Sequence, residues 1–146
     1  MRGIGFKVYL DIAKALKHRV RVVKDNDGNY QKNIVEWRNK DYDGCNFIEC
    51  LSPTDDAHYS LEPALIASNC ATDEALNKLA KVMLSTQTFN DYTAAGDLAM
   101  RRKFFEDWYA KKDGGGKKVD SAIRIFDSTV AINYPEYLIE AMTFGS

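Results

Sequence analysis

The spacing of apolar residues along the first part of the chain predicts a helix and then a strand. From Phe6 to Leu16, apolar side chains recur every three or four positions and charged side chains occupy the opposite side. This is the period of an amphipathic helix. The period changes to two at Val20 and Val22, which alternate with arginines as in a half-buried strand. We therefore expect an N-terminal helix followed by a sheet.

Turn signals divide the next part of the chain into further strands. Asn26-Asp27-Gly28-Asn29 is typical of a hairpin turn, which predicts a second strand from about Tyr30 to Arg38. A turn cluster from Asn39 to Gly44 leads to a third strand, Cys45 to Leu51. The segment from His58 to Ile66 fits a fourth strand, although its proline also permits a short helix. These segments predict an antiparallel meander of three to four strands.

The rest of the chain has the pattern of about four helices. Their expected starts are Thr72, Asn90 or Asp91, Asp120, and the sequence Asn133-Tyr134-Pro135-Glu136. The second of these helices is expected to reach about Lys112, where Gly114 to Gly116 end it. Together with the meander, these helices predict an α+β fold. The length of 146 residues matches one domain, so we expect residues 1–146 to form a single domain.

Composition narrows the classes of partner. The chain carries 20 Lys and Arg against 21 Asp and Glu, a net charge of −1, so no field of the whole molecule attracts a polyanion. No apolar run is long enough for a signal peptide or a membrane span. The odd number of cysteines, at Cys45, Cys50 and Cys70, is typical of reduced thiols. We expect a cytoplasmic protein, in the host cytoplasm if it is viral, that does not bind membranes.

The sequence contains one candidate catalytic group. His58-Tyr59-Ser60 fits the His-x-Ser half-motif of two-histidine phosphodiesterases, in which imidazole and hydroxyl flank a phosphate. Those enzymes need two copies, whereas His18 is followed by Arg19 and Val20. General acid–base catalysis needs a second positioned group. His58 and Ser60 are therefore the alternative catalytic residues, and the favoured interpretation assigns no catalytic residue. The spacing of Cys, His, Asp and Glu also predicts neither a metal site nor a cofactor.

A cluster of cations and aromatic residues is the candidate binding surface. Arg101-Arg102-Lys103 is followed by Phe104, Phe105, Trp108 and Tyr109. Such interleaving can hold single-stranded nucleic acid, but at helical spacing the aromatic residues are more simply a core-facing stripe. Protein interfaces concentrate their binding energy in a few Trp, Tyr and Arg side chains. We therefore expect Arg101, Arg102 and Tyr109 to bind a partner, with a host protein or complex favoured over nucleic acid.

One segment resembles a known family. Tyr42 to Ser52, with its glycine turn and Glu-Cys-Leu-Ser ending, resembles the central strand motif of the ArdB/KlcA antirestriction family. Thr72 to Ala75, Trp108 to Ala110 and Ala122 to Asp127 are loosely similar to later elements of that family. The segment Val20 to Arg38 departs from it, and the family's His-Pro-Glu-like element is missing. The resemblance implies a small phage or plasmid protein that blocks a host defence system, with no catalytic residue to carry over.

These patterns favour a non-enzymatic binding or inhibitory protein that acts through a protein surface, plausibly as an antirestriction-like, anti-defence protein. The motivation is the absence of a recognisable reaction centre in the sequence together with an aromatic content of 12%. The alternative is a small enzyme directed at nucleotides or nucleic acids that uses His58 and Ser60. The oligomeric state is left open.

Overall fold

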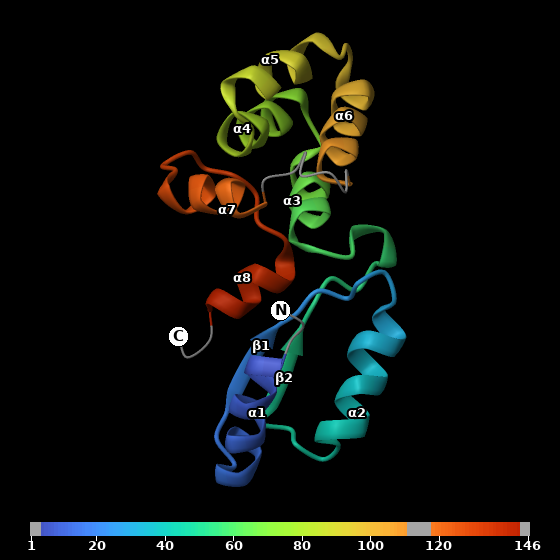
Figure 1. The fold of residues 1–146 in the computed structure, drawn as a ribbon, viewed down its shortest axis with the longest axis vertical. Coiled ribbons are helices and arrows are strands. Elements are labelled where there is room, and N and C mark those ends of the chain that lie inside the picture. Colours follow the sequence, from blue (N-terminus) through green and yellow to red (C-terminus); the bar gives the residue numbers. More distant parts are fainter. Residues whose placement is uncertain (1–3, 111–117, 144–146) are drawn as a thin grey trace. The chain divides into compact units, whose positions relative to one another are not determined.

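The protein is mainly helical and has two short strands, as the computed structural model shows for residues 4–110 and 118–143 (Figure 1). Contacts divide the chain into two units. The first comprises the described residues up to Ser60 together with those from Glu136 onward, and the second is Leu61–Pro135. The α+β meander predicted from the sequence is therefore wrong. The single domain over residues 1–146 stays a prediction.

The first unit alternates helices and strands. Its elements are α1 (Ile4–Leu16), β1 (Val20–Val23), a π-helical segment η1 (Gln31–Glu36), α2 (Trp37–Tyr42), β2 (Ile48–Leu51), a 3-10 turn η2 (Asp56–His58) and α8 (Glu136–Met142). The first helix, the first strand and the last helix lie where the sequence predicts them.

The two strands are parallel, with Val20 opposite Ile48 and Val23 opposite Leu51. Parallel strands need a crossover connection, and η1 with α2 provides it. The predicted second strand from Tyr30 to Arg38 is therefore wrong. Its apolar residues also fit the i, i+4, i+7 spacing of a helix, and in the structure that period prevails.

Two further strand predictions need correction. The third strand is confirmed only from Ile48 to Leu51, because Cys45 begins a turn in which its carbonyl accepts a hydrogen bond from the Ile48 amide. The predicted fourth strand from His58 to Ile66 is wrong, because η2 ends there and α3 (Leu61–Asn69) begins. Pro63 lies in the first turn of α3, where a missing amide hydrogen removes no helical hydrogen bond.

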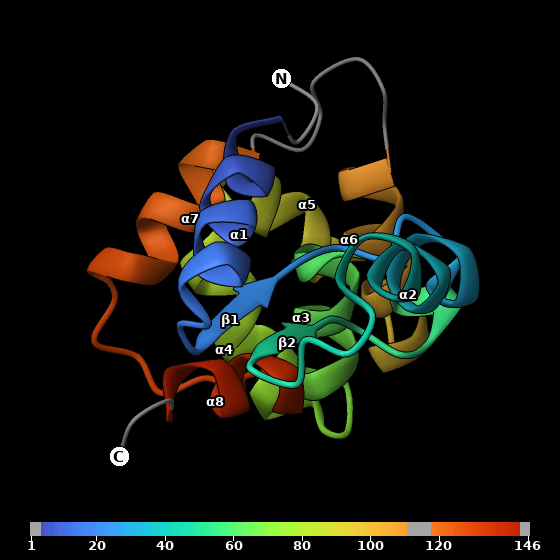
Figure 2. The same ribbon diagram turned by 90° about the horizontal axis from the view of Figure 1, so that it is seen from below.

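The two faces of the small sheet have different neighbours (Figure 2). Val20 and Val22 pack against a core cluster that includes Leu10 of α1 and Tyr42 of α2. Arg21 points to the opposite face because side chains alternate along a strand. There its guanidinium forms ion pairs with Glu49 of β2 and Glu140 of α8. The single arginine therefore connects three elements of the first unit.

The second unit consists of helices. After α3 come α4 (Asp73–Met83), α5 (Thr86–Ala94), α6 (Leu98–Ala110) and α7 (Lys118–Asp127). Their shared core contains Leu65, Ile66, Leu76, Leu79, Ala80, Met83, Leu84, Tyr92, Phe105 and Tyr109. The predicted cap at Thr72 is confirmed, since its hydroxyl accepts a hydrogen bond from the Ala75 amide at 3.2 Å.

The long helix predicted from Asn90 or Asp91 to about Lys112 is divided into two. Ser85 caps α5 by accepting a hydrogen bond from the Thr88 amide. The break between α5 and α6 falls at Gly96, whose φ of +115° suits glycine and strains other residues. Asp97 then accepts a hydrogen bond from the Met100 amide and starts α6. The predicted stop at Gly114 to Gly116 lies outside the described residues.

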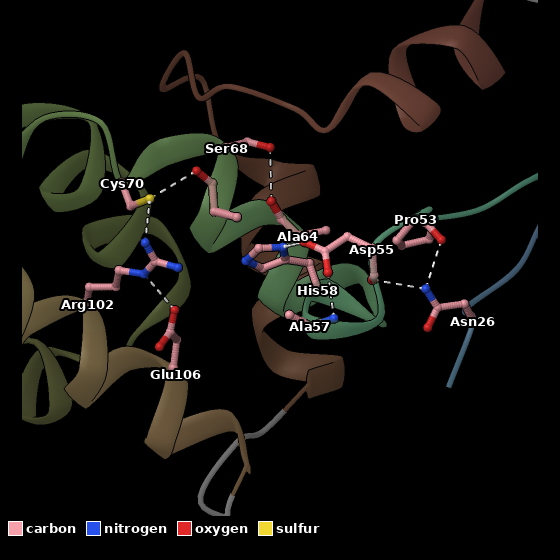
Figure 3. Close-up of polar contacts among 11 residues, drawn as sticks. Asn26, Pro53, Asp55, Ala57, His58, Ala64, Ser68, Cys70, Arg102 and Glu106 are labelled. Atoms are coloured by element: carbon pink, nitrogen blue, oxygen red, sulfur yellow. Dashed lines mark hydrogen bonds and ion pairs between the residues drawn. The ribbon is translucent and has the colours of Figure 1, made fainter. Parts of the chain in front are cut away.

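A buried asparagine organises the loops of the first unit (Figure 3). Asn26 is fully buried, and its Nδ2 donates hydrogen bonds to the carbonyl oxygens of Pro53 at 2.8 Å and Asp55 at 3.1 Å. Its Oδ1 accepts a hydrogen bond from the backbone amide of Gly28, and the backbone amide of Asn26 donates one to the Tyr59 carbonyl. The Asn26 turn therefore leads into a helix and holds the loop after β2, instead of closing a hairpin.

We expect Asn26→Ala to lower the free energy of unfolding by about 2–4 kcal/mol, because two loop carbonyls and one amide lose their buried partner. Urea unfolding followed by far-ultraviolet circular dichroism measures the change. Asn39→Ala, at an exposed position of α2, is the matched control and should change stability by about 0.5 kcal/mol or less. Equal effects of the two substitutions would show that the buried amide does not hold the loop.

The ion pair between Arg21 and Glu49 predicts a pH dependence. The hydrogen bond donated by Arg21 holds the pKa of Glu49 below its ordinary value of 4.5, and the charges of Arg21 and Arg19 add to this effect. A carboxylate whose pKa is lowered by folding contributes stability above the unfolded pKa and loses it as the pH falls. Glu49→Gln should therefore reduce stability at pH 7, by about 1 kcal/mol or less because Glu49 is one third exposed.

The difference between the wild type and Glu49→Gln should narrow as the pH falls below 4.5. Urea titrations from pH 7 to pH 3 measure it. Glu36→Gln, at an exposed position of η1, serves as the control. A difference that stays constant over this range would contradict a role for the ion pair.

Candidate functional site

The candidate histidine has a partner that the sequence interpretation missed. Asp55 caps the short turn η2, where its Oδ1 accepts a hydrogen bond from the Ala57 amide at 2.7 Å. Its Oδ2 lies 2.5 Å from Nδ1 of His58 (Figure 3). The hydrogen bond from Ala57, and then that from His58, hold the pKa of Asp55 below its ordinary value. The signal in the sequence was the Asp-x-x-His spacing, in which a capping carboxylate lies one turn before an imidazole.

The dyad resembles one part of a catalytic site. A carboxylate on Nδ1 orients the imidazole and leaves Nε2 as the outward nitrogen, as in general acid–base catalysis. His58 is partly exposed, whereas the Ser60 side chain is buried. Three surface hollows lie within residues 61–135, and neither His58 nor Ser60 lines any of the three. The dyad therefore lies at the surface, but those hollows provide no place for a substrate beside it.

Arg101 has structural contacts in the second unit. Its guanidinium donates hydrogen bonds to the Gly96 carbonyl at 2.7 Å and to Oδ1 of Asn77 at 3.2 Å. It also lies 3.5 Å from the carboxylate of Asp73. The same amide oxygen of Asn77 accepts a hydrogen bond from the buried Tyr92 hydroxyl. Arg101 therefore connects the start of α6, the preceding loop and α4, and it is only partly exposed.

Arg102 contacts a carboxylate and a thiol (Figure 3). It pairs with Glu106 at 2.7 Å on the next turn of α6, and its Nη1 lies 3.3 Å from Sγ of Cys70. Cys70 is one of three free thiols, as the sequence predicts for all three cysteines. Nε and Nη1 of Arg102 thus bond groups of the second unit itself, and the side chain remains partly exposed at the surface.

Tyr109 does not lie at the surface, contrary to its predicted role in binding a partner. It is only 7% exposed and belongs to the core of the second unit. Its hydroxyl donates to Oγ of Ser121 at 2.7 Å, and that hydroxyl donates in turn to the Met83 carbonyl. Burial raises the pKa of Tyr109. Tyr109 therefore joins α6 to α7 and α4, and we remove it from the candidate partner surface.

The apolar side of α7 is exposed, and the sequence interpretation did not identify it as a surface. The exposed fractions are 72% for Val119, 54% for Ile123 and 90% for Phe126. These three residues follow the i, i+4, i+7 spacing of one helix face. The side that packs inward includes Ser121, which is 2% exposed. We call Val119, Ile123 and Phe126 the α7 stripe.

A second exposed apolar row lies on α1 in the first unit. Val8, Ile12 and Leu16 are all at least half exposed, while Leu10 and Ala13 face the core of that unit. α1 thus buries two apolar side chains, whereas the buried residue of α7 is the polar Ser121. The α1 row is therefore a useful comparison for the α7 stripe.

Two features of the described residues concern ligands and membranes. No group of three or more His, Cys, Asp or Glu side chains among them is placed to hold a metal ion. None of the helices described for residues 4–110 and 118–143 has both the length and the apolar character needed to cross a bilayer.

The chain matches no family model, no curated protein and no solved structure. The resemblance of Tyr42 to Ser52 to the ArdB/KlcA family therefore stays a prediction.

The contacts of Arg101 predict an effect on stability. We expect Arg101→Gln to lower the free energy of unfolding by about 1–2 kcal/mol, because two hydrogen bonds and one ion pair of the guanidinium are lost. Lys103→Gln is the matched control on the same helix and should change stability little, because the pair that Lys103 forms with Asp107 is exposed to solvent. Thermal and urea unfolding measure both. If Arg101→Gln were as stable as Lys103→Gln, the contacts of Arg101 would not stabilise the second unit.

Proposed function

We propose that this chain is a non-enzymatic binding protein whose protein partner packs on the α7 stripe. The observation that carries the proposal is the orientation of α7. This helix turns Ser121 inward and Phe126 outward, although burying the phenylalanine would contribute more to folding. An apolar face that does not serve the core of its own unit is typical of an interaction surface.

The α7 stripe suits one recognised mode of binding. An amphipathic helix lays apolar side chains at i, i+4 and i+7 into an apolar groove of its partner. Phe126 is the natural anchor, because a few large side chains carry most of the energy of such interfaces. The partner that fits is therefore a protein with an apolar groove. Nucleic acid fits less well, since the stripe carries no cation and the chain as a whole is nearly neutral.

The ArdB/KlcA resemblance supports one choice of first partner. It implies an anti-defence role, so a host restriction complex is the partner to test before others. The competing proposal is a small enzyme directed at nucleotides or nucleic acids. It has gained support from the Asp55–His58 pair, and His58→Ala tests it directly.

We expect the double substitution Ile123→Ser and Phe126→Ser to weaken partner binding at least about 30-fold, because loss of an anchor typically costs about 2 kcal/mol or more. Stability should change little, since both side chains are exposed in the folded protein. The measurement has two parts. Cells that carry a restriction complex and express the chain are challenged with unmodified phage, and a photo-crosslinking amino acid at position 126 captures the contacting protein.

The controls separate the outcomes. Val8→Ser with Ile12→Ser, on the α1 row, should leave protection and capture at position 126 unchanged. A crosslinker placed at position 103 of α6 should give no specific adduct. Protection that survives the α7 substitutions, with no specific adduct at position 126, would refute the α7 surface. Protection abolished by His58→Ala in folded protein would favour the enzyme instead.

A further inference from the structure

A hollow in the second unit lies where four helices meet. Its volume is about 140 Å³, and its lining residues are Met83, Ser85, Thr88, Trp108, Asp120, Ser121 and Arg124. They come from the end of α4, the start of α5, the C-terminal half of α6 and the first two turns of α7. A cavity of about 150 Å³ holds a benzene-sized molecule, so the hollow has room for one aromatic ring or a group of similar size.

The walls of the hollow combine apolar and polar surfaces. Met83 and the partly exposed ring of Trp108 provide the apolar part. The polar part includes the hydroxyls of Ser85 and Thr88, whose oxygens lie 2.9 Å apart at the N-terminus of α5. Only one of these two hydroxyls can donate its hydrogen to the other, so the second has a hydrogen to offer. Backbone amides at a helix start also favour negative charge.

Arg124 adds a cation to the lining. It is exposed, and it forms no ion pair or hydrogen bond with any residue that the structure describes. Its positive charge reaches this region of the unit: burial raises the pKa of the neighbouring Tyr109, and the charge of Arg124 partly offsets that rise. The Ser121 hydroxyl, by contrast, already accepts a hydrogen bond from Tyr109 and donates its single hydrogen to the Met83 carbonyl. Arg124 is therefore the charged group of the lining that has hydrogen-bonding capacity to spare.

We propose that this hollow binds a small organic monocarboxylate with an aromatic or similarly sized apolar body. The guanidinium of Arg124 pairs with the carboxylate, a geometry in which two N–H groups face two oxygens. The Ser85–Thr88 pair donates a further hydrogen bond, and Trp108 and Met83 pack on the apolar body. Asp120 also lines the hollow, so a ligand with one negative charge fits better than a phosphate with nearly two. The proposal does not rest on the protein partner of the α7 stripe.

Benzoate is the probe, and nitrogen–proton correlation spectra of the full chain provide the measurement. The Trp108 indole signal is identified by comparison with Trp37→Phe. We expect a saturable shift of this signal with benzoate. Benzyl alcohol, which has a similar size but no charge, should bind at least about tenfold more weakly than benzoate, because it forms no charge-assisted hydrogen bond.

Arg124→Gln should weaken benzoate binding about tenfold or more and remove the preference for benzoate over benzyl alcohol. Arg124→Lys should retain part of the preference, because it keeps the charge but loses the two-pronged geometry. Lys103→Gln is the matched control and should leave binding unchanged. The same spectra show whether each variant is folded. Absence of a saturable shift, equal binding of the two probes, or benzoate binding unaffected by Arg124→Gln would each overturn the proposal.

Discussion

The buried amide of Asn26 determines the course of the chain through the first unit. Asn26 lies in the loop after β1, and its hydrogen bonds reach Pro53, Asp55 and Tyr59, all of which follow β2. The ends of the two strands are thereby held at the same edge, as a parallel pair requires. The Asn26 carbonyl also accepts a hydrogen bond from Asn33 Nδ2, which fixes the start of the crossover helix. The Asp55–His58 pair owes its position to this network, because Asp55 is one of the residues held.

The same network explains which parts of this fold could be predicted from the sequence. The alternation at Val20 and Val22 is local, and it correctly indicates a strand. The turn at Asn26 is not decided locally, since Asn-Asp-Gly-Asn suits both a hairpin and a loop in which the asparagine bonds its own backbone. Partners about 27 residues away decide between them. A hairpin at Asn26 makes the segment from Tyr30 to Arg38 its second strand, although the apolar spacing of this segment also permits a helix.

The candidate site residues also differ in whether their roles could be predicted from the sequence. His58 could be found from the sequence, because histidine is rare here and its chemistry is distinctive. The roles of Arg101 and Tyr109 could not, because they depend on groups brought together by packing. A tyrosine in an aromatic stripe can face solvent or the core, and the hydroxyl of Ser121 makes the buried position favourable by satisfying the phenol. Arg101 is likewise directed to α4 by an amide oxygen of Asn77, which lies 24 residues earlier.

The two faces of α7 have different roles: one packs on the core of the second unit, and the other is exposed. Ser121 and the partly buried Ile125 attach α7 to the core of the second unit, and the Lys118–Glu62 ion pair adds a link to α3. Phe126 is 90% exposed, so it is almost as accessible to water in the folded chain as in the unfolded one. Side chains that remain exposed contribute little hydrophobic free energy to folding, and polar residues would serve that purpose equally well. The stability of the second unit therefore does not explain why the α7 stripe is apolar. A partner that buries these three side chains would gain the hydrophobic free energy that folding of the unit does not provide.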